Sequence, residues 1–142
     1  MPHDAELVAA TRAWLQRAEE DLQLGEVALR SKKSLANGAT FHAQQAVEKA
    51  MKGFLTWHAS VFGKTHLLAE IGRACCGIDP TLEAVVRRAV PLTEYAWKSR
   101  YPGDWSEPTR EEAVQAVKLA QSVLSAILAR VPEEAHPLQG SA

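Results

Sequence analysis

The chain has 142 residues, with 16 basic and 17 acidic side chains, and its net charge at pH 7 is −1. This length fits one domain that buries about two-thirds of its unfolded surface, and the balanced charge excludes a general attraction to nucleic acid or anionic membranes. No apolar run reaches the roughly 18 residues that a membrane span needs, and the N-terminus lacks the layout of a signal peptide, so we expect a cytoplasmic protein.

Hydrophobic side chains recur at helical spacing along most of the chain. We predict a first long helix over residues 5–30 and a second that begins between residues 35 and 39 and runs to about residue 60. A short third helix is expected over residues 66–75. The fourth helix starts at residue 81 and carries apolar positions to residue 96, and the last long helix ends near residue 131.

Several residues mark where these helices begin, bend and end. Thr65 is a good N-cap for the short helix. Pro91 removes a backbone donor inside the fourth helix and predicts a kink there. Thr109 and Glu112 have the spacing of a capping box at the start of the last helix, and Pro132 ends it.

The helical pattern predicts the fold class directly. No stretch alternates at period two, so we expect an all-α fold, an antiparallel four-helix up-and-down bundle with one extra short helix. Residues 1–131 form a single helical domain in this prediction, and residues 132–142 a disordered tail. The third and fourth helices are too short to cover the other three, which predicts a homodimer or a partner subunit.

A family resemblance centres on the second helix. The string Phe-His-Ala-Gln-Gln-Ala-Val-Glu-Lys-Ala at residues 41–50, followed by Lys52 and then by Lys-Thr-His-x-Leu at residues 64–68, resembles the core of the HEPN family (higher eukaryotes and prokaryotes nucleotide-binding). Residues 14–22 resemble the family's first helix, and Arg-Tyr-Pro-Gly at residues 100–103 resembles the junction before its last long helix. The resemblance covers roughly residues 12 to 130 and implies a helical fold.

Many members of this family are metal-independent ribonucleases, and the resemblance makes that activity the first one to test. They place an Arg, then a His after four to six residues, at the start of the last long helix. The 2′-OH of RNA attacks its own phosphate if a base takes the proton and a cation stabilises the developing charge. Arg100 stands at the position of that Arg, but no histidine follows at the required spacing. The same spacing between Arg130 and His136 is attributed to chance, because Pro132 separates them.

The resemblance therefore favours a binding subunit over an enzyme. Similar stand-alone proteins pair with a separately encoded minimal nucleotidyltransferase, often as a toxin–antitoxin couple, and the Gly-Ser plus Asp-x-Asp pattern of that transferase is absent here. We expect a non-catalytic, dimeric subunit that binds a nucleotide or RNA. The alternatives are a metal-independent endoribonuclease that uses Arg100 and an oligomerising scaffold with no ligand.

Two residues before the last helix are the first binding candidates. Arg100 can take a phosphate and Tyr101 can stack on a base. Asp21 lies at the margin of the apolar face of the first helix, where a carboxylate needs a donor. It either makes a helix-packing hydrogen bond or orients a functional Arg or Lys across the bundle, and Arg100 is one candidate partner.

Further candidates lie on the second helix and after it. Gln45, Lys49 and Lys52 line one side of the second helix, as a solvated face or as a surface for a nucleotide or partner. Lys64 and the N–H groups that follow Thr65 form a helix N-terminus able to hold an anion, and His66 follows at once. His42, His58 and His66 are scattered, and we interpret them first as packing or capping residues. No closely spaced set of ligands is present, so we expect no metal and no cofactor.

Overall fold

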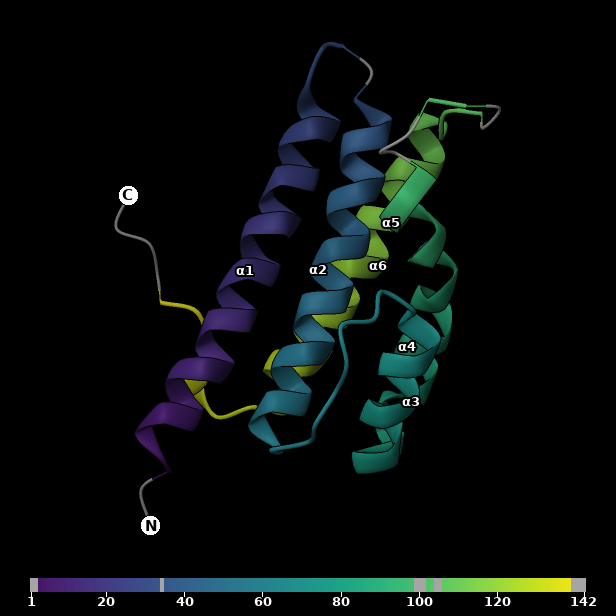
Figure 1. The fold of residues 1–142 in the computed structure, drawn as a ribbon. Helices are drawn as coiled ribbons and strands as arrows, with labels where there is room; N and C mark the ends of the chain where they lie inside the picture. Colours follow the sequence, from purple (N-terminus) through teal and green to yellow (C-terminus); the bar gives the residue numbers. More distant parts are fainter. Residues whose placement is uncertain (1–2, 34, 99–101, 104–105, 139–142) are drawn as a thin grey trace.

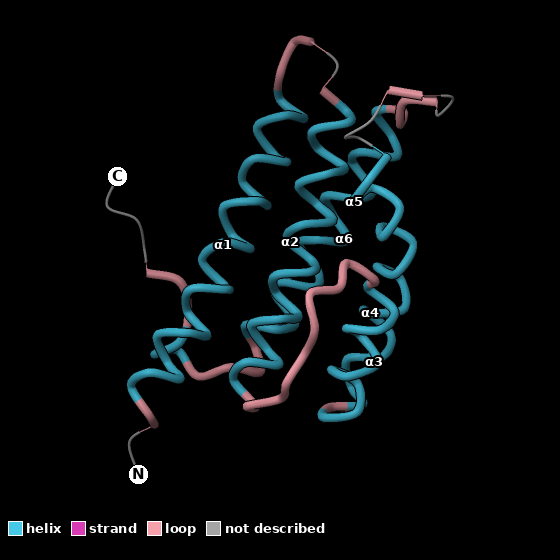
Figure 2. Tube along the Cα trace, in the orientation of Figure 1, coloured by secondary structure: helices cyan, strands magenta, loops and turns pink. Residues whose placement is uncertain are grey.

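The structure is a computed structural model, and it describes residues 3–33, 35–98, 102–103 and 106–138. Over these residues the chain is all-α and contains no strand, as Figures 1 and 2 show. Three long helices run lengthwise beside one another: α1 (Ala5–Arg30), α2 (Ala36–Trp57) and α6 (Arg110–Leu128). The predicted all-α bundle is confirmed. None of the helices described is long and apolar enough to cross a membrane.

The central helix is α2, which packs against α1, α3 (Leu68–Ile78), α5 (Tyr95–Lys98), α6 and η2 (Val90–Glu94). Its small residues Ala43, Ala46 and Ala50 are fully buried and let the neighbouring helices approach closely. At Gly53 an added Cβ would lie 2.8 Å from Leu15 Cδ2 on α1. The lack of a side chain at Gly53 therefore sets how near α1 comes to the second half of α2.

The segment between α2 and α3, residues 58–67, folds back across α2, and we call it the crossing segment. Ala59 has a left-handed backbone with φ of 53° just after α2 ends, a conformation that costs a residue with a side chain about 1–2 kcal/mol. The next helix, α3 (Leu68–Ile78), begins two residues later than predicted. Thr65 is not its N-cap: Leu67 holds that position, and Thr65 Oγ1 accepts the Leu67 N–H in the turn before the helix. The chain between α2 and α3 thus has a defined path, visible in front of α2 in Figure 2.

The predicted fourth helix is divided into four short pieces. They are η1 (Pro80–Leu82), α4 (Glu83–Ala89), η2 (Val90–Glu94) and α5 (Tyr95–Lys98). The expected bend at Pro91 takes the form of a 3₁₀ turn over five residues, because proline lacks the N–H that an α-helix would use there. The result is a curved wall beside α6.

The start of α6 matches its prediction and the chain beyond its end does not. Thr109 and Glu112 form both hydrogen bonds of a capping box. After α6, residues 132–138 pack on α1 instead of detaching. The 3₁₀ turn η3 (Glu133–Ala135) places Ala135 in the core, and Arg12 Nε donates to the carbonyl of His136 at 3.1 Å. A buried alanine and a cross-chain donor order this stretch, and neither is visible in its proline-rich, polar sequence.

Candidate functional site

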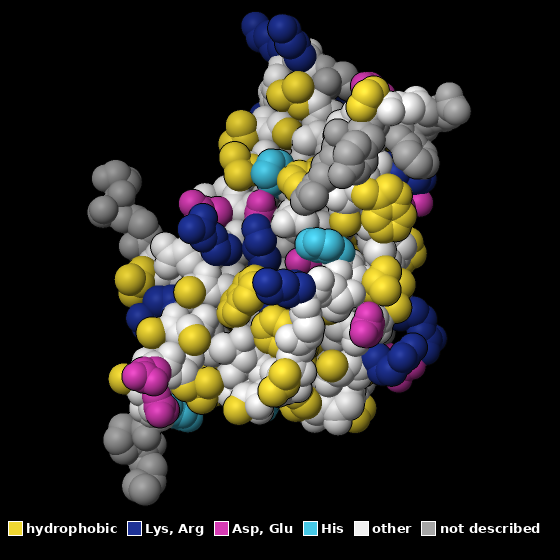
Figure 3. Space-filling model, in the orientation of Figure 1, with side chains coloured by type: hydrophobic (Ala, Val, Ile, Leu, Met, Phe, Trp, Pro, Cys, Tyr) yellow, Lys and Arg dark blue, Asp and Glu magenta, His cyan; other side chains and the backbone are white. Residues whose placement is uncertain are grey.

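One side of α2 is polar although the helix is almost entirely enclosed. At about 100° per residue, six side chains fall within one arc of α2. We call this set the α2 polar strip: His42, Gln44, Gln45, Glu48, Lys49 and Lys52. Gln44, Gln45, Glu48 and Lys52 are buried, so the interpretation of this side as a solvated face is wrong. Figure 3 shows basic, acidic and histidine side chains gathered in the middle of the face formed by α1, α2 and the crossing segment.

Glu48 is the centre of a buried hydrogen-bond network. Its side chain is 5% exposed, and its Oε2 accepts from Lys52 Nζ at 3.0 Å, one helical turn away. Its Oε1 accepts from Gln44 Nε2 at 3.1 Å, while Gln45 Nε2 donates to Gln44 Oε1 at 2.7 Å. The same Oε1 lies 2.8 Å from Nδ1 of His66, near the end of the crossing segment. The carboxylate thereby joins two turns of α2 to a distant part of the chain.

The ammonium of Lys52 is enclosed on its other sides by aromatic rings. It lies 5.7 Å from the ring centre of Trp14 on α1 and 5.8 Å from that of Phe62 on the crossing segment. The two rings meet edge to face at 5.9 Å. Rings in such positions attract a cation, so Lys52 is held in place by Glu48 and by two aromatic faces.

The hydrogen bond to Glu48 fixes which nitrogen of His66 carries a proton. A carboxylate only accepts, so Nδ1 must donate, and a neutral His66 keeps its lone pair on Nε2. The side chain of His66 is 55% exposed, whereas Glu48 is enclosed. The structure therefore presents an oriented imidazole to solvent, with a buried carboxylate behind it.

Burial raises the pKa of Glu48, but hydrogen bonds from His66, Lys52 and Gln44 outweigh that cost and hold its pKa below the ordinary value of 4.5. Glu48 is thus ionised near neutral pH. Its charge balances that of Lys52, and this part of the strip carries no net charge when His66 is neutral.

A second carboxylate forms a similar cluster between α1 and α2. Asp21 on α1 accepts from Nδ1 of His42 at 2.8 Å and from Nζ of Lys49 at 2.6 Å. Lys49 and His42 of α2 thus supply the donors that this carboxylate needs, and the contact is compatible with a packing bond or with the orienting of a functional lysine. The carboxylate is 9% exposed and the two partners are 29% and 25% exposed.

Comparison with known proteins places the chain in a family. The sequence profile of the HEPN domain matches residues 11–131. The chain belongs to the HEPN domain family. It is 28% identical over 131 residues to the protein named "Putative toxin MJ1304" from Methanocaldococcus jannaschii, an alignment that covers 82% of this chain and 84% of the relative. No solved structure matches the chain.

The two carboxylate clusters are built from the residues that carry the resemblance. In this HEPN domain, the string at residues 41–50, together with Lys52, forms the strip on α2, and His66 comes from the second motif. The structure brings Gln45, Lys52 and His66 into one network around Glu48. Lys49 belongs to the neighbouring cluster around Asp21.

Other predicted residues fall outside these clusters or outside the described structure. Arg100 and Tyr101 lie outside the described residues, as does any pairing of Arg100 with Asp21. Lys64 is exposed, two residues before His66. The proposed anion site at the start of α3 is weakened, because the Leu68 N–H already donates to Thr93 Oγ1.

Two of the three histidines predicted to be packing or capping residues make a hydrogen bond to a carboxylate. His42 and His66 each bond to a buried carboxylate, whereas His58 packs its ring on Phe54 at 4.6 Å. Among the described residues no group of three His, Cys, Asp or Glu side chains can hold a metal ion. Arg130 pairs with Asp79 and His136 bonds to backbone carbonyls, so this Arg and His do not form one site.

Glu48 is the functional candidate that the sequence analysis missed. A signal was present: Gln44, Glu48 and Lys52 are spaced by four residues, so they meet on one helix face and can form a chain of hydrogen bonds. That spacing does not reveal burial, because the covering rings of Trp14 and Phe62 come from elsewhere in the chain.

Proposed function

We propose that this HEPN domain is a dimeric helical binding subunit that pairs with a separate minimal nucleotidyltransferase in a toxin–antitoxin-like couple. It binds a nucleotide beside the α2 polar strip and does not cut RNA itself. The observation that carries the proposal is the exposed imidazole of His66, oriented through Nδ1 by the buried Glu48.

An oriented imidazole suits recognition of a nucleotide. The Nε2 lone pair of His66 can accept a hydrogen bond from a base amine or a sugar hydroxyl. Lys64 is exposed two residues away and supplies a positive charge for a phosphate. Glu48 and its partners fix the ring before the ligand arrives, which lowers the entropic cost of binding.

The charges along the strip favour binding over catalysis. Cleavage of RNA needs a cation that is available to the charge developing on the phosphate. Lys49 is neutralised by Asp21, and Lys52 is neutralised by Glu48 and enclosed by rings. The two lysines of the strip therefore hold the fold together. The relative named as a toxin supports a role of the same kind for this chain.

Thermal unfolding with and without nucleotides tests the proposal. A nucleotide at ten times its Kd should stabilise the fold by about 1.4 kcal/mol, which raises the Tm by roughly 3–6 °C for a domain of this size. The substitution His66→Ala should abolish the shift, and the matched control His58→Ala should keep it. No shift in the wild type at millimolar ATP, GTP, CTP or UTP would favour the scaffold without a ligand.

Purification of the tagged chain from its own host tests the pairing. A small nucleotidyltransferase should co-purify with the wild type. Recovery of the chain alone at native expression levels would contradict the pairing with a nucleotidyltransferase. It would not affect nucleotide binding, which the thermal unfolding experiment tests independently.

A second candidate function is a metal-independent endoribonuclease. The orientation of His66 by Glu48 favours it, because a base for the 2′-OH needs the same fixed tautomer. Incubation with RNA in EDTA decides between the two. We expect no cleavage; cleavage that is lost in both His66→Ala and Arg100→Ala would establish the nuclease.

A further inference from the structure

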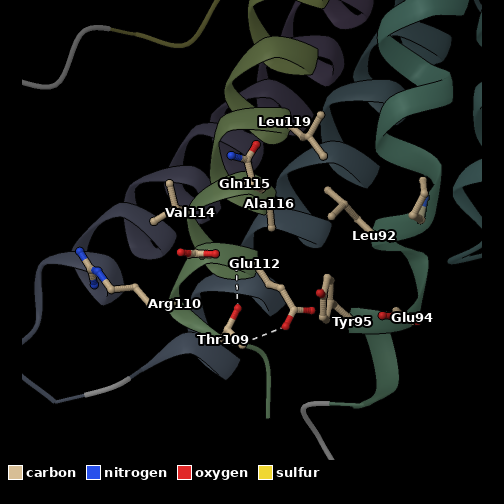
Figure 4. Close-up of a pocket in the computed structure, with 12 residues that line it drawn as sticks. Leu92, Glu94, Tyr95, Thr109, Arg110, Glu112, Val114, Gln115, Ala116 and Leu119 are labelled. Carbon is tan, nitrogen blue, oxygen red and sulfur yellow. Dashed lines mark hydrogen bonds between the residues drawn. The ribbon is translucent and has the colours of Figure 1, made fainter. Parts of the chain in front are cut away.

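A groove lies on a part of the molecule that shares no residue with the α2 polar strip. It runs between the η2–α5 segment and the first three turns of α6 and has a volume of about 790 Å³. Figure 4 shows its walls: Leu92, Glu94 and Tyr95 on one side, and residues of α6 on the other.

The two ends of the groove differ in polarity. Leu92 faces Ala116 and Leu119 of α6 at one end, and these side chains form an apolar floor (Figure 4). At the other end Glu94 and Glu112 lie beside Tyr95, and Glu111 also lines the groove. The groove thus combines an apolar surface with three carboxylates.

Over the described part of the chain, the acidic end of the groove carries more negative than positive charge. Among the lining residues that the structure describes, Arg110 is the one basic side chain, and its Nη1 donates to the carbonyl of Leu29 at the end of α1, 2.8 Å away. Lys98 pairs with Glu94 at 3.1 Å, so among the described residues Glu111 and Glu112 face one remaining cation, Arg110, and a net negative charge is left. Burial raises the pKa of the Tyr95 phenol, and the charges of Glu112 and Glu94 raise it further, as expected for a site of negative potential.

We infer that this groove docks a basic amphipathic helix from the protein with which the HEPN domain pairs. Apolar residues of that helix, spaced by three and four, would cover Leu92 and Leu119, and flanking Lys or Arg residues would meet Glu111 and Glu112. A bare metal ion does not fit, because the described carboxylates do not converge on one point. This inference rests on the proposed function, since it names the docking face for that partner.

A labelled amphipathic peptide of Leu, Ala and Lys is a direct probe of the groove. The full chain should bind it, as measured by fluorescence anisotropy, whereas a peptide with Glu in place of Lys should not bind. Joint replacement of Glu94, Glu111 and Glu112 by Gln should weaken binding about tenfold, because it removes the charges that meet the lysines. Gln at 112 can still complete the capping box, so the fold is retained.

A matched control removes the same number of carboxylates elsewhere. The combined variant Glu19→Gln, Glu20→Gln, Glu83→Gln changes α1 and α4, and it should bind the peptide within about twofold of the wild type because it leaves the groove intact. A separate variant, Leu119→Asn, tests the apolar end and should also weaken binding. Equal weakening in the control and in the groove variant would overturn the inference, because it would show general charge attraction.

Two further results separate this inference from the proposed function. If a groove variant turns a dimer into a monomer and the wild-type dimer does not bind the peptide, the groove holds a second copy and the inference fails. If a nucleotidyltransferase co-purifies equally with wild type and groove variants, the pairing stands and the docking face is wrong. Nucleotide-dependent stabilisation should be unchanged in every groove variant.

Discussion

Asp21 and Glu48 lie on neighbouring helices and have partners of the same kinds. Each accepts from the Nδ1 of a histidine at 2.8 Å and from the ammonium of a lysine, at 2.6 Å for Asp21 and 3.0 Å for Glu48. The chemistry of the two clusters is therefore nearly identical. What differs is where the partners come from and how far water reaches them.

The Asp21 cluster joins two helices, because its carboxylate is on α1 and both partners are on α2. The Glu48 cluster has its lysine on the same helix and its histidine on the segment before α3. Lys52 is 7% exposed and Lys49 is 25% exposed, while His66 is the most exposed of the partners. The first cluster clamps the bundle, and the second is a buried support for an imidazole that faces solvent.

The largest effect should come from removing the buried carboxylate. Glu48→Ala leaves the ammonium of Lys52 enclosed without a counter-charge, and such a change costs about 3–5 kcal/mol. The free energy of unfolding, measured by urea denaturation and tryptophan fluorescence, should fall by that amount. Glu20→Ala is the control, because Glu20 is 60% exposed and its loss should cost less than about 0.5 kcal/mol.

A second substitution separates the charge from the cavity. In Glu48→Ala with Lys52→Met, the unpaired charge is gone, and the free energy of unfolding should recover by about 1–3 kcal/mol. If Glu48→Ala costs no more than the Glu20 control, water reaches the ammonium of Lys52, and the two clusters do not differ in their access to water.

The corresponding change at Asp21 should cost less. Asp21→Ala frees Lys49 and His42, but both are partly exposed and can turn to water, so we expect a loss of about 1–2 kcal/mol. The same denaturation measurement applies. A loss as large as that of Glu48→Ala would show that the Asp21 cluster is shielded from water as well as the Glu48 cluster is.

The sequence predicted the bundle because its helical signals are local. The stripe of Ala43, Val47, Ala50 and Phe54 defines the inner face of α2, and the capping box at Thr109 sets the start of α6. These features depend on spacing of three and four residues within one helix. The antiparallel arrangement of α1 and α2 then follows from the short connection between them.

The site was only partly predictable because its contacts join residues that are far apart in the sequence. The sequence indicates a surface position for Lys52 on a polar stripe, and it does not show that Trp14 and Phe62, from two other segments, lie against its ammonium. His66 lies 18 residues from Glu48, and its position depends on the left-handed turn at Ala59. Contacts that are remote in sequence, and a backbone turn at an ordinary alanine, leave no periodic signal.

Acid should weaken the Glu48 cluster by a smaller amount than either substitution. Because the folded pKa of Glu48 lies below the ordinary value of 4.5, its stabilising contribution is complete above that pH and is lost as the pH falls through the folded pKa. The loss on protonation is set by the net lowering of the Glu48 pKa, and burial offsets part of what the hydrogen bonds contribute, which is why the loss is modest. The difference in unfolding free energy between wild type and Glu48→Gln, measured from pH 6 to about pH 3, should therefore shrink toward acid. A difference that stays constant across this range would mean that the ionised form gains nothing from His66 and Lys52, and that hydrogen-bonding shape alone distinguishes this cluster from the one around Asp21.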